Sequence, residues 1–420
     1  MNNGYGNWRS GVVRLLAASA ALALCSCVVH PGGGDGRLWL KSTINGKPAR
    51  LAFDTGAGVP VLFGPAAKKF GLSITNRPNV ESLGPAEIRM MTGVCKVKID
   101  HSDLRTWFGV VDVPPGAESD ADGVIGWLTL KNNIIAVDAI HETVSFLRSL
   151  PRKAAGWTKL SLVTNSDVLL MTVPRPGGTP CSVLVDTGST LGVHLFPGQW
   201  QEWKTAHADQ PVTLTAYYDS LDGQVVAEEG WAKTLAIGSL WLTNVPVTKA
   251  PNLDLLVGST NTVASLGMAA LKRFDLVIDG KKGFACLHPK EGPPPPYKYN
   301  RLGAVFAPTN SEGENLVASV VAGSPAWEAG IRPGDVLTRV GNRDVTNWRK
   351  DPTIVPPLRK LLTAVKGGQA LIAAQPAIMP PLWKLVRQPP GTKIELTLMR
   401  GEEQIIAHAV LREILSPEAK

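Results

Sequence analysis

The stretch ARLAFDTGAGVPVLFG, residues 49–64, decides the fold because it recurs as PCSVLVDTGSTLGVHLF at residues 180–196. Each copy consists of an apolar run, Asp-Thr-Gly, a short gap and a second apolar run that closes on Phe63 or Phe196. Apolar runs of this length, separated by glycine-containing turns, predict a strand, a turn and a second strand. The chain therefore contains two copies of one supersecondary unit.

A second correspondence lies downstream of each copy. The segment DGVIGWLTLKNNIIAVDAIHETVSFL, residues 122–147, is matched by ASLGMAALKRFDLVIDGKKGFACL, residues 264–287. Both reach a glycine, Gly126 or Gly267, and then continue through a short helical piece into an apolar strand. Two matched segments in the same order indicate an internal repeat.

The rest of residues 37–288 also favours β structure. Most segments have four to eight residues rich in Val, Ile, Leu, Thr and Trp, separated by Gly, Pro, Asn and Asp, which is typical of short strands and tight turns. Residues 38–53 carry Asn45-Gly46 between alternating runs, which predicts a hairpin. We expect a mainly β protein.

The two aspartates of the repeat, Asp54 and Asp186, point to a specific chemistry. Hydrolysis of a peptide bond by water needs a base to activate the water and an acid to protonate the leaving nitrogen. Two carboxylates held about 3 Å apart share one proton and can fill both roles. Such a mechanism requires two aspartates in equivalent settings, and the repeat provides them.

The residues beside each aspartate suit this arrangement. Gly56 and Gly188 let the backbone turn sharply and bring N–H groups close to the carboxylates. Thr55 and Thr187 offer hydroxyls that can hydrogen-bond the opposite loop and hold the two turns together.

On these motifs the two halves resemble the lobes of the retropepsin-like and pepsin-like aspartic proteases. In that family a hydrophobic-hydrophobic-Gly segment backs each Asp-Thr-Gly loop, and here the matching segments are Val124-Ile125-Gly126 and Ser265-Leu266-Gly267, the second with serine in place of an apolar residue. The resemblance implies a bilobal pair of β-barrel lobes, 37–150 and 151–288, that bind a polypeptide substrate between them. It also implies that the paired aspartates are catalytic and that the glycines and threonines support them.

The resemblance also implies a hairpin in each lobe that covers the substrate. Residues 79–94 and 214–231 are the candidate flap hairpins, and the second contains Tyr217 and Tyr218.

Other catalytic classes fit less well. The segment GSTLG, residues 188–192, places its serine one position too early for a G-x-S-x-G nucleophile elbow. His141-Glu142 lacks the second histidine of a zinc-protease helix, and no His/Cys group has metal-ligand spacing. We therefore expect no cofactor and no metal.

A linker and a further domain follow the repeat. Pro293–Pro296 favour extended polyproline geometry, which predicts a semi-rigid linker over residues 289–299. In residues 300–416, Gly323-Ser324-Pro325-Ala326 would open a short helix, and an Arg400-Gly401 turn is expected to close a final strand pair. With these parts the segment resembles an α+β PDZ domain of the kind appended to bacterial envelope proteases.

The resemblance also implies where a PDZ ligand would bind. Leu302, Gly303, Ala304 and Val305 would form the loop whose backbone N–H groups receive a peptide carboxylate, and the peptide would add as a strand beside residues 304–307. The middle of this domain, residues 353–391, is unusually long, and we expect a helix over 357–365 as a wall of the groove or, alternatively, a segment that occludes it.

The N-terminal residues have the layout of a secretory signal. Arg9 and Arg14 precede an apolar run, residues 15–24, that is too short to span a bilayer. The run ends in Leu24-Cys25-Ser26-Cys27, which resembles the lipobox of bacterial lipoproteins. The resemblance implies a signal over residues 1–27, lipidation of Cys27, a tether over 28–36 and a periplasmic, outer-membrane location; ordinary cleavage to a soluble protein is the alternative.

Three cysteines remain after the signal: Cys95, Cys181 and Cys286. An odd number cannot all pair within one chain. Cys181 and Cys286 fall in the same expected lobe, so a disulfide between them and buried free thiols are both open.

The sequence as a whole thus predicts an aspartic endopeptidase of the cell envelope whose PDZ domain recruits or regulates. A net charge of +8 does not indicate nucleic-acid binding, because the Lys and Arg residues are scattered and form no recognition motif. The rival reading is a non-catalytic, protease-like peptide-binding adaptor; a third keeps the enzyme but makes it a highly selective processing protease.

Overall fold

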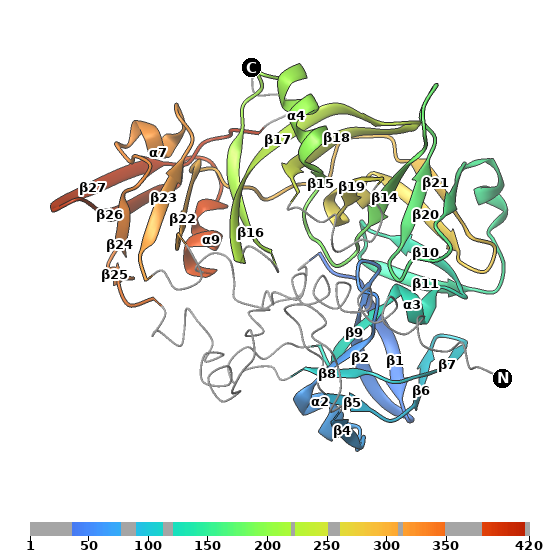
Figure 1. Cartoon of the computed structure of the whole chain (residues 1–420). Helices are drawn as coiled ribbons and strands as arrows, with labels where there is room; N and C mark the ends of the chain where they lie inside the picture. The colour runs from blue at the N-terminus through green and yellow to red at the C-terminus, as the bar shows by residue number, and fades with distance from the viewer. Residues whose placement is uncertain are drawn as a thin grey trace, which may run out of the picture.

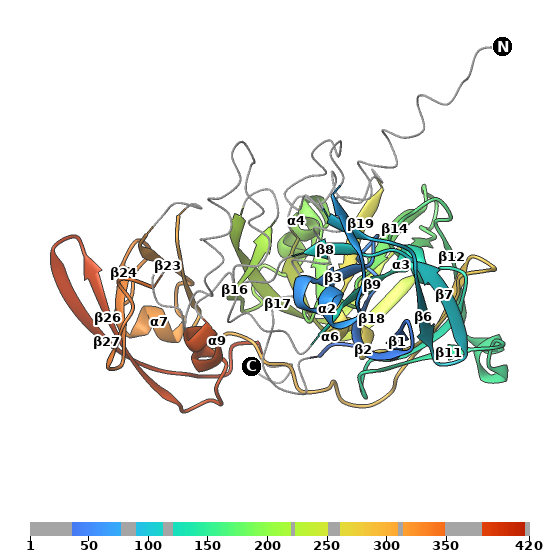
Figure 2. The same cartoon turned by 90° about the horizontal axis from the view of Figure 1, so that it is seen from below.

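The computed structural model describes residues 36–76, 90–111, 121–219, 223–250, 261–309, 314–348 and 380–415. Within them the chain forms three curled sheets, with the first sheet and the C-terminal sheet at opposite ends of the molecule (Figures 1 and 2). The expectation of a mainly β protein is confirmed. No helix in the described part of the chain is long and apolar enough to cross a membrane.

The first sheet has nine strands within the described residues. In spatial order they are β4 (Ile74–Asn76), β5 (Met90–Thr92), β8 (Gly109–Val111), β3 (Val61–Phe63), β9 (Gly123–Gly126), β2 (Lys47–Asp54), β1 (Trp39–Ile44), β6 (Cys95–Ile99) and β7 (Ser102–Thr106). The hairpin expected around Asn45-Gly46 is confirmed as β1–β2, with Ile44 opposite Lys47. Both turn residues have positive φ, 49° and 82°, as a two-residue hairpin turn requires.

The second sheet has twelve strands in the part of the chain that the structure describes. In spatial order they are β11 (Thr143–Leu147), β10 (Ile134–Asp138), β20 (Phe274–Asp279), β21 (Phe284–Pro289), β12 (Thr158–Leu162), β13 (Leu170–Val173), β14 (Cys181–Val185), β19 (Thr262–Leu266), β15 (Val193–Leu195), β18 (Leu240–Lys249), β17 (Gly223–Ile237) and β16 (Thr213–Asp219).

The internal repeat is visible in the strand order. The run β4-β5-β8-β3-β9-β2-β1 of the first sheet matches β16-β17-β18-β15-β19-β14-β13 of the second. The directions of pairing match too: β2 with β9 and β14 with β19 are parallel, whereas β3 with β9 and β15 with β19 are antiparallel. The two sequence copies therefore fold as two copies of one unit.

Short helices recur at equivalent places. After β3 and β15 come α2 (Gly64–Lys69) and α4 (Pro197–Ala206), and after β9 and β19 come α3 (Trp127–Leu130) and α6 (Met268–Leu271). Both α2 and α4 begin with a proline in the first turn, where its missing N–H costs nothing. A short 3-10 helix, η1 (Arg152–Gly156), links the two units.

The two units are fastened together through the second sheet. Strands β10 and β11 precede the boundary expected after residue 150, yet β10 pairs antiparallel with β20 of the second half. One hydrophobic core runs through both units, with Phe53, Ile135 and Phe274 among its buried members. The domain boundary after residue 150 stays a prediction. Strand β10 joins the two halves, so it does not mark where one ends and the other begins.

The third sheet forms a C-terminal domain with its own core. Its strands are β22 (Ala304–Ala307), β23 (Leu316–Val320), β24 (Val336–Val340), β26 (Lys393–Arg400) and β27 (Glu403–Val410), in that order, with β25 (Arg343–Asp344) beside β24. Its described residues also include two helices, α7 (Pro325–Glu328) and α9 (Pro380–Val386). The helix expected near 325 and the strand pair closing at Arg400-Gly401 are confirmed.

Some expectations fall outside the described residues. These are the signal, Cys27 and the tether, the first flap candidate over residues 79–89, and the helix over 357–365. The second flap candidate is a hairpin, β16–β17. Cys95, Cys181 and Cys286 are buried free thiols, so the structure contains no disulfide between Cys181 and Cys286.

Candidate functional site

The two Asp-Thr-Gly loops meet where the two units join. Asp54 ends β2, which lies parallel to β9 with Asp54 opposite Gly126. Asp186 directly follows β14, and its N–H donates to the carbonyl of Leu266, one residue before Gly267. The repeat thus brings Asp54 and Asp186 to equivalent ends of two parallel strand pairs, as the sequence predicted.

Each carboxylate is held by its own loop. The N–H of Gly56 donates to Oδ1 of Asp54 at 2.9 Å, and the N–H of Gly188 donates to Oδ1 of Asp186 at 3.0 Å. Asp186 accepts a further bond from the N–H of Ser189 at 3.2 Å. Only 2% of Asp54 and 8% of Asp186 is exposed. The side chains are therefore buried and fixed by backbone donors.

The two threonines lock the loops to each other. The hydroxyl of Thr187 accepts the N–H of Thr55 at 3.0 Å and donates to the carbonyl of Phe53 at 2.9 Å. Reciprocally, the hydroxyl of Thr55 accepts the N–H of Thr187 at 3.1 Å and donates to the carbonyl of Val185 at 2.6 Å. The four bonds cross between the two units and are buried, so they fix the spacing of the loops.

Gly56 sets how closely the loops approach. A methyl group on this residue would lie 2.6 Å from Oδ1 of Asp186, so only glycine fits between the two loops. Gly126 and Gly267 play matched roles behind the loops, since a methyl group on either would lie 2.2 Å from the carbonyl oxygen of Ala57 or 2.4 Å from that of Leu191. The structure thus gives a steric reason for each of these glycines.

The closeness of the carboxyls changes their titration. Burial, the charge of Asp54 and a hydrogen bond to the Asp54 side chain raise the pKa of Asp186 well above its usual range. The N–H groups of Gly188 and Ser189 oppose this rise but do not cancel it. At a pH where an exposed aspartate is ionised, these effects favour a neutral Asp186 beside Asp54.

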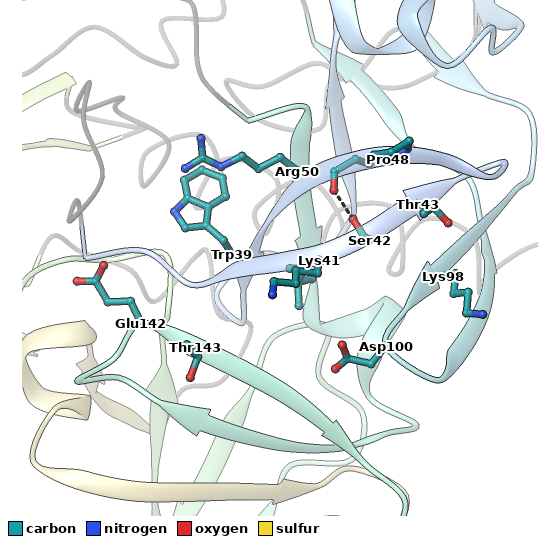
Figure 3. Close-up of a pocket in the computed structure, with 12 residues that line it drawn as sticks. Trp39, Lys41, Ser42, Thr43, Pro48, Arg50, Lys98, Asp100, Glu142 and Thr143 are labelled. Atoms are coloured by element: carbon teal, nitrogen blue, oxygen red, sulfur yellow. Dashed lines mark hydrogen bonds between the residues drawn. The ribbon is translucent and has the colours of Figure 1, made fainter.

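A surface groove lies apart from this pair. It is lined by residues of β1 and β2 together with Glu142 and Thr143, and the guanidinium of Arg50 stacks over Trp39 at 4.0 Å (Figure 3). Neither Asp54 nor Asp186 lines it. The groove is therefore not part of the candidate site.

The loop expected to bind a PDZ ligand enters β22. Leu302 and Ala304 are buried in the C-terminal core, and Gly303 has a φ of 73° with no room for a side chain, since a methyl group would lie 2.3 Å from Cβ of Ser324. Val305 is also buried, at 2% exposure, but it belongs to a different cluster that includes residues of β16.

Comparison with known proteins identifies the C-terminal domain. A family model for the PDZ domain matches residues 316–353, and no curated protein matches the chain. The chain therefore contains a PDZ domain, a module for protein interaction that suggests a peptide or protein ligand.

Sequence reasoning missed two features of this domain. The helix beside β22 is α9, and the signal for it is the spacing of Leu382 and Val386, which are both buried and lie one helical turn apart. The second is Asn300, which no motif marks but which is fully buried at the entrance to β22.

The threonine lock can be tested by comparing Thr187→Ala with Thr187→Ser. Alanine leaves the N–H of Thr55 and the carbonyl of Phe53 buried without partners, which should cost about 2–5 kcal/mol of unfolding free energy. Serine keeps the hydroxyl and should cost about 1 kcal/mol. Urea denaturation measures both; equal losses in the two variants would contradict the lock.

The raised pKa of Asp186 predicts a pH-dependent gain in stability for Asp186→Asn. Because the folded carboxyl holds its proton more tightly than the unfolded one, wild-type stability falls as pH rises from the ordinary aspartate range through the raised pKa. Asparagine carries no charge to bury, so the variant should melt higher than wild type at neutral pH, and the gain should vanish near pH ~4.

Thermal unfolding between pH ~4 and ~8 measures this gain. Asp209→Asn, at an exposed position in the same unit, is the matched control and should leave the melting temperature unchanged. A melting temperature for Asp186→Asn at or below that of wild type at neutral pH would contradict the prediction. It would show that burial and the charge of Asp54 do not destabilise the ionised form of Asp186.

Proposed function

We propose that this chain is an aspartic endopeptidase, in which Asp54 and Asp186 activate water to hydrolyse peptide bonds. One observation carries the proposal: two buried carboxyl groups from equivalent loops share a hydrogen bond, and burial together with the charge of Asp54 raises the pKa of Asp186. A pair in which one member keeps a proton offers an acid and a base at the same place.

The reaction follows from these protonation states. Asp54, as the ionised member, takes a proton from water, and the water oxygen bonds to the carbonyl carbon of the peptide. Asp186, as the neutral member, first donates its proton to the carbonyl oxygen. Asp54 then gives its proton to the leaving nitrogen while Asp186 takes a proton back from a hydroxyl of the tetrahedral diol. The C–N bond breaks, a carboxylic acid and an amine are released, and the pair regains its starting protonation. The N–H groups of Gly56 and Gly188 keep the carboxylates in place throughout.

The substrate under this proposal is an extended polypeptide bound between the two units. The hairpin β16–β17 lies in the second unit at the position that β4–β5 holds in the first, which supports a role as one wall of the binding region. We further propose, on the lipobox resemblance, that Cys27 carries a lipid anchor in the bacterial envelope, with the outer membrane favoured. Loss of radiolabelled palmitate incorporation in Cys27→Ser, with incorporation in wild type, tests the anchor.

The activity is tested by Asp54→Asn and Asp186→Asn. Each substitution removes one half of the acid–base pair but keeps the shape of the side chain, so each should lower peptide turnover by about 10²–10⁴-fold. A diverse peptide library analysed by mass spectrometry reports cleavage, and a statine-type inhibitor should block it.

The outcomes separate the candidate functions. Retained turnover in either asparagine variant contradicts the paired-carboxylate mechanism. Cleavage of a narrow subset of peptides defines a selective processing protease. A folded wild-type protein that cleaves nothing at any pH would instead favour a non-catalytic adaptor whose PDZ domain binds peptides.

The pH dependence gives a second, independent test. Activity requires one proton on the pair, so the rate should fall on the alkaline side as pH rises through the raised pKa of Asp186. Because that pKa lies above the ordinary value of about 3.9, substantial activity should persist at pH values where an isolated aspartate is fully ionised. Measurement of kcat/KM from pH ~3 to ~8 should show this fall in rate on the alkaline side. A rate that rises steadily towards alkaline pH would exclude the proposal.

A further inference from the structure

Two sheet edges meet between the second unit and the PDZ domain. Strand β16 is the outermost strand of the twelve-stranded sheet, and β22 is the outermost strand of the PDZ sheet. They lie beside each other, with α9 next to β22 (Figure 1). Among the described strands, β22 forms a ladder only with β23, so its other edge is the one to which a peptide strand would add.

An apolar cluster seals this junction. Ala304 and Phe306 of β22 point into the PDZ core, whereas Val305 and Ala307 pack with Leu214 of β16. All five are buried. The residues that pack against this second cluster come from the hairpin, from the end of β23 and from α9: Ala216, Val226, Val321 and Trp383. The hairpin β16–β17 therefore contacts β22, and Trp383 of α9 packs against the same cluster.

Asn300 fastens the hairpin to the ligand loop. The side-chain nitrogen of Asn300 donates a hydrogen bond to the carbonyl of Leu214 at 2.9 Å. The main-chain carbonyl of Asn300 accepts a hydrogen bond from the hydroxyl of Thr213 at 2.6 Å. The side-chain oxygen of Asn300 accepts the N–H of Leu302 at 3.0 Å and of Gly303 at 3.2 Å. Both N–H groups belong to the loop that would receive a ligand carboxylate. In this structure they donate to the side chain of Asn300 instead.

The buried carboxyl group of Glu229, on strand β17 of the hairpin, makes a further connection. Glu229 of β17 is fully buried and accepts a hydrogen bond from the hydroxyl of Tyr297 in the linker. The guanidinium of Arg387, one residue after α9, interacts electrostatically with both. Because a buried carboxylate is costly without its partners, these groups favour the docked hairpin.

We propose that the hairpin β16–β17 is the intramolecular occupant of the ligand-binding edge of the PDZ domain, so that a peptide ligand binds there only when the hairpin leaves. Leu214 of the hairpin packs on Val305 and Ala307 of β22, and the N–H groups of Leu302 and Gly303 already bond the Asn300 side chain that also holds the hairpin. Since β17 pairs with β18, and β18 with β15 just after the Asp186 loop, undocking alters the unit that carries Asp186. Only this last consequence, a link between ligand binding and turnover, rests on the proposed function.

Hydrogen–deuterium exchange of the full-length protein tests the docking. Leu214→Glu breaks the contact from the hairpin, and Ala307→Glu breaks it from the PDZ domain. Both should speed exchange of residues 213–219 and 304–307 about tenfold or more. Ile406→Glu, at a 56% exposed position on β27, is the matched control and should change neither segment. Unchanged protection in both junction variants would overturn the proposal.

Competition is tested first with a peptide pool and wild-type protein. The probe is a fluorescein-labelled decapeptide pool with randomised last four residues and a free C-terminal carboxylate. Saturating pool should raise the exchange of residues 213–219, and Leu214→Glu, which changes only the hairpin, should bind it about tenfold more tightly than wild type or Ile406→Glu.

Peptide binding that leaves residues 213–219 protected, or equal affinity in wild type, Leu214→Glu and Ile406→Glu, would overturn competition. Neither readout requires turnover. A failure here is therefore distinguishable from a failure of the proposed protease activity.

Discussion

The reciprocal hydrogen bonds between Thr55 and Thr187 are the constraint on which the rest of the structure depends. Each hydroxyl accepts the opposite N–H and donates to a carbonyl of the opposite unit, so neither loop can move alone. These bonds are buried, and their loss would leave backbone groups unsatisfied in an apolar environment. The position of both carboxylates, and therefore the raised pKa of Asp186, follows from this lock.

The lock works because the two units are also joined elsewhere. The pairing of β10 with β20 and a shared hydrophobic core also join the two units. The threonine hydrogen bonds are therefore not the sole connection that keeps the two loops in contact. Gly56 then permits an approach that any side chain would block. Burial beside a second carboxylate destabilises the ionised form of Asp186, and such a cost at a defined place is typical of a functional site.

The PDZ domain is integrated with the repeat rather than appended to it. Apolar contacts, Asn300 and the buried Glu229 join it to the hairpin β16–β17 of the second unit. An edge strand that is covered by its own chain cannot pair with another molecule without exchange, which also protects the protein from edge-to-edge aggregation. The same contact gives the domain a physical connection to the unit that carries Asp186.

The sequence by itself determined the strands, the Asn45-Gly46 hairpin, the repeat, the paired aspartates and the PDZ domain, because these depend on local propensity and on matched spacing. Only the tertiary structure decided that β10 joins the second sheet, that Cys181 and Cys286 stay unpaired, and that Asn300 fills the ligand loop. Those outcomes depend on contacts between residues far apart in the chain. The packing of the folded chain sets the distance between such residues. A local sequence pattern does not predict that distance.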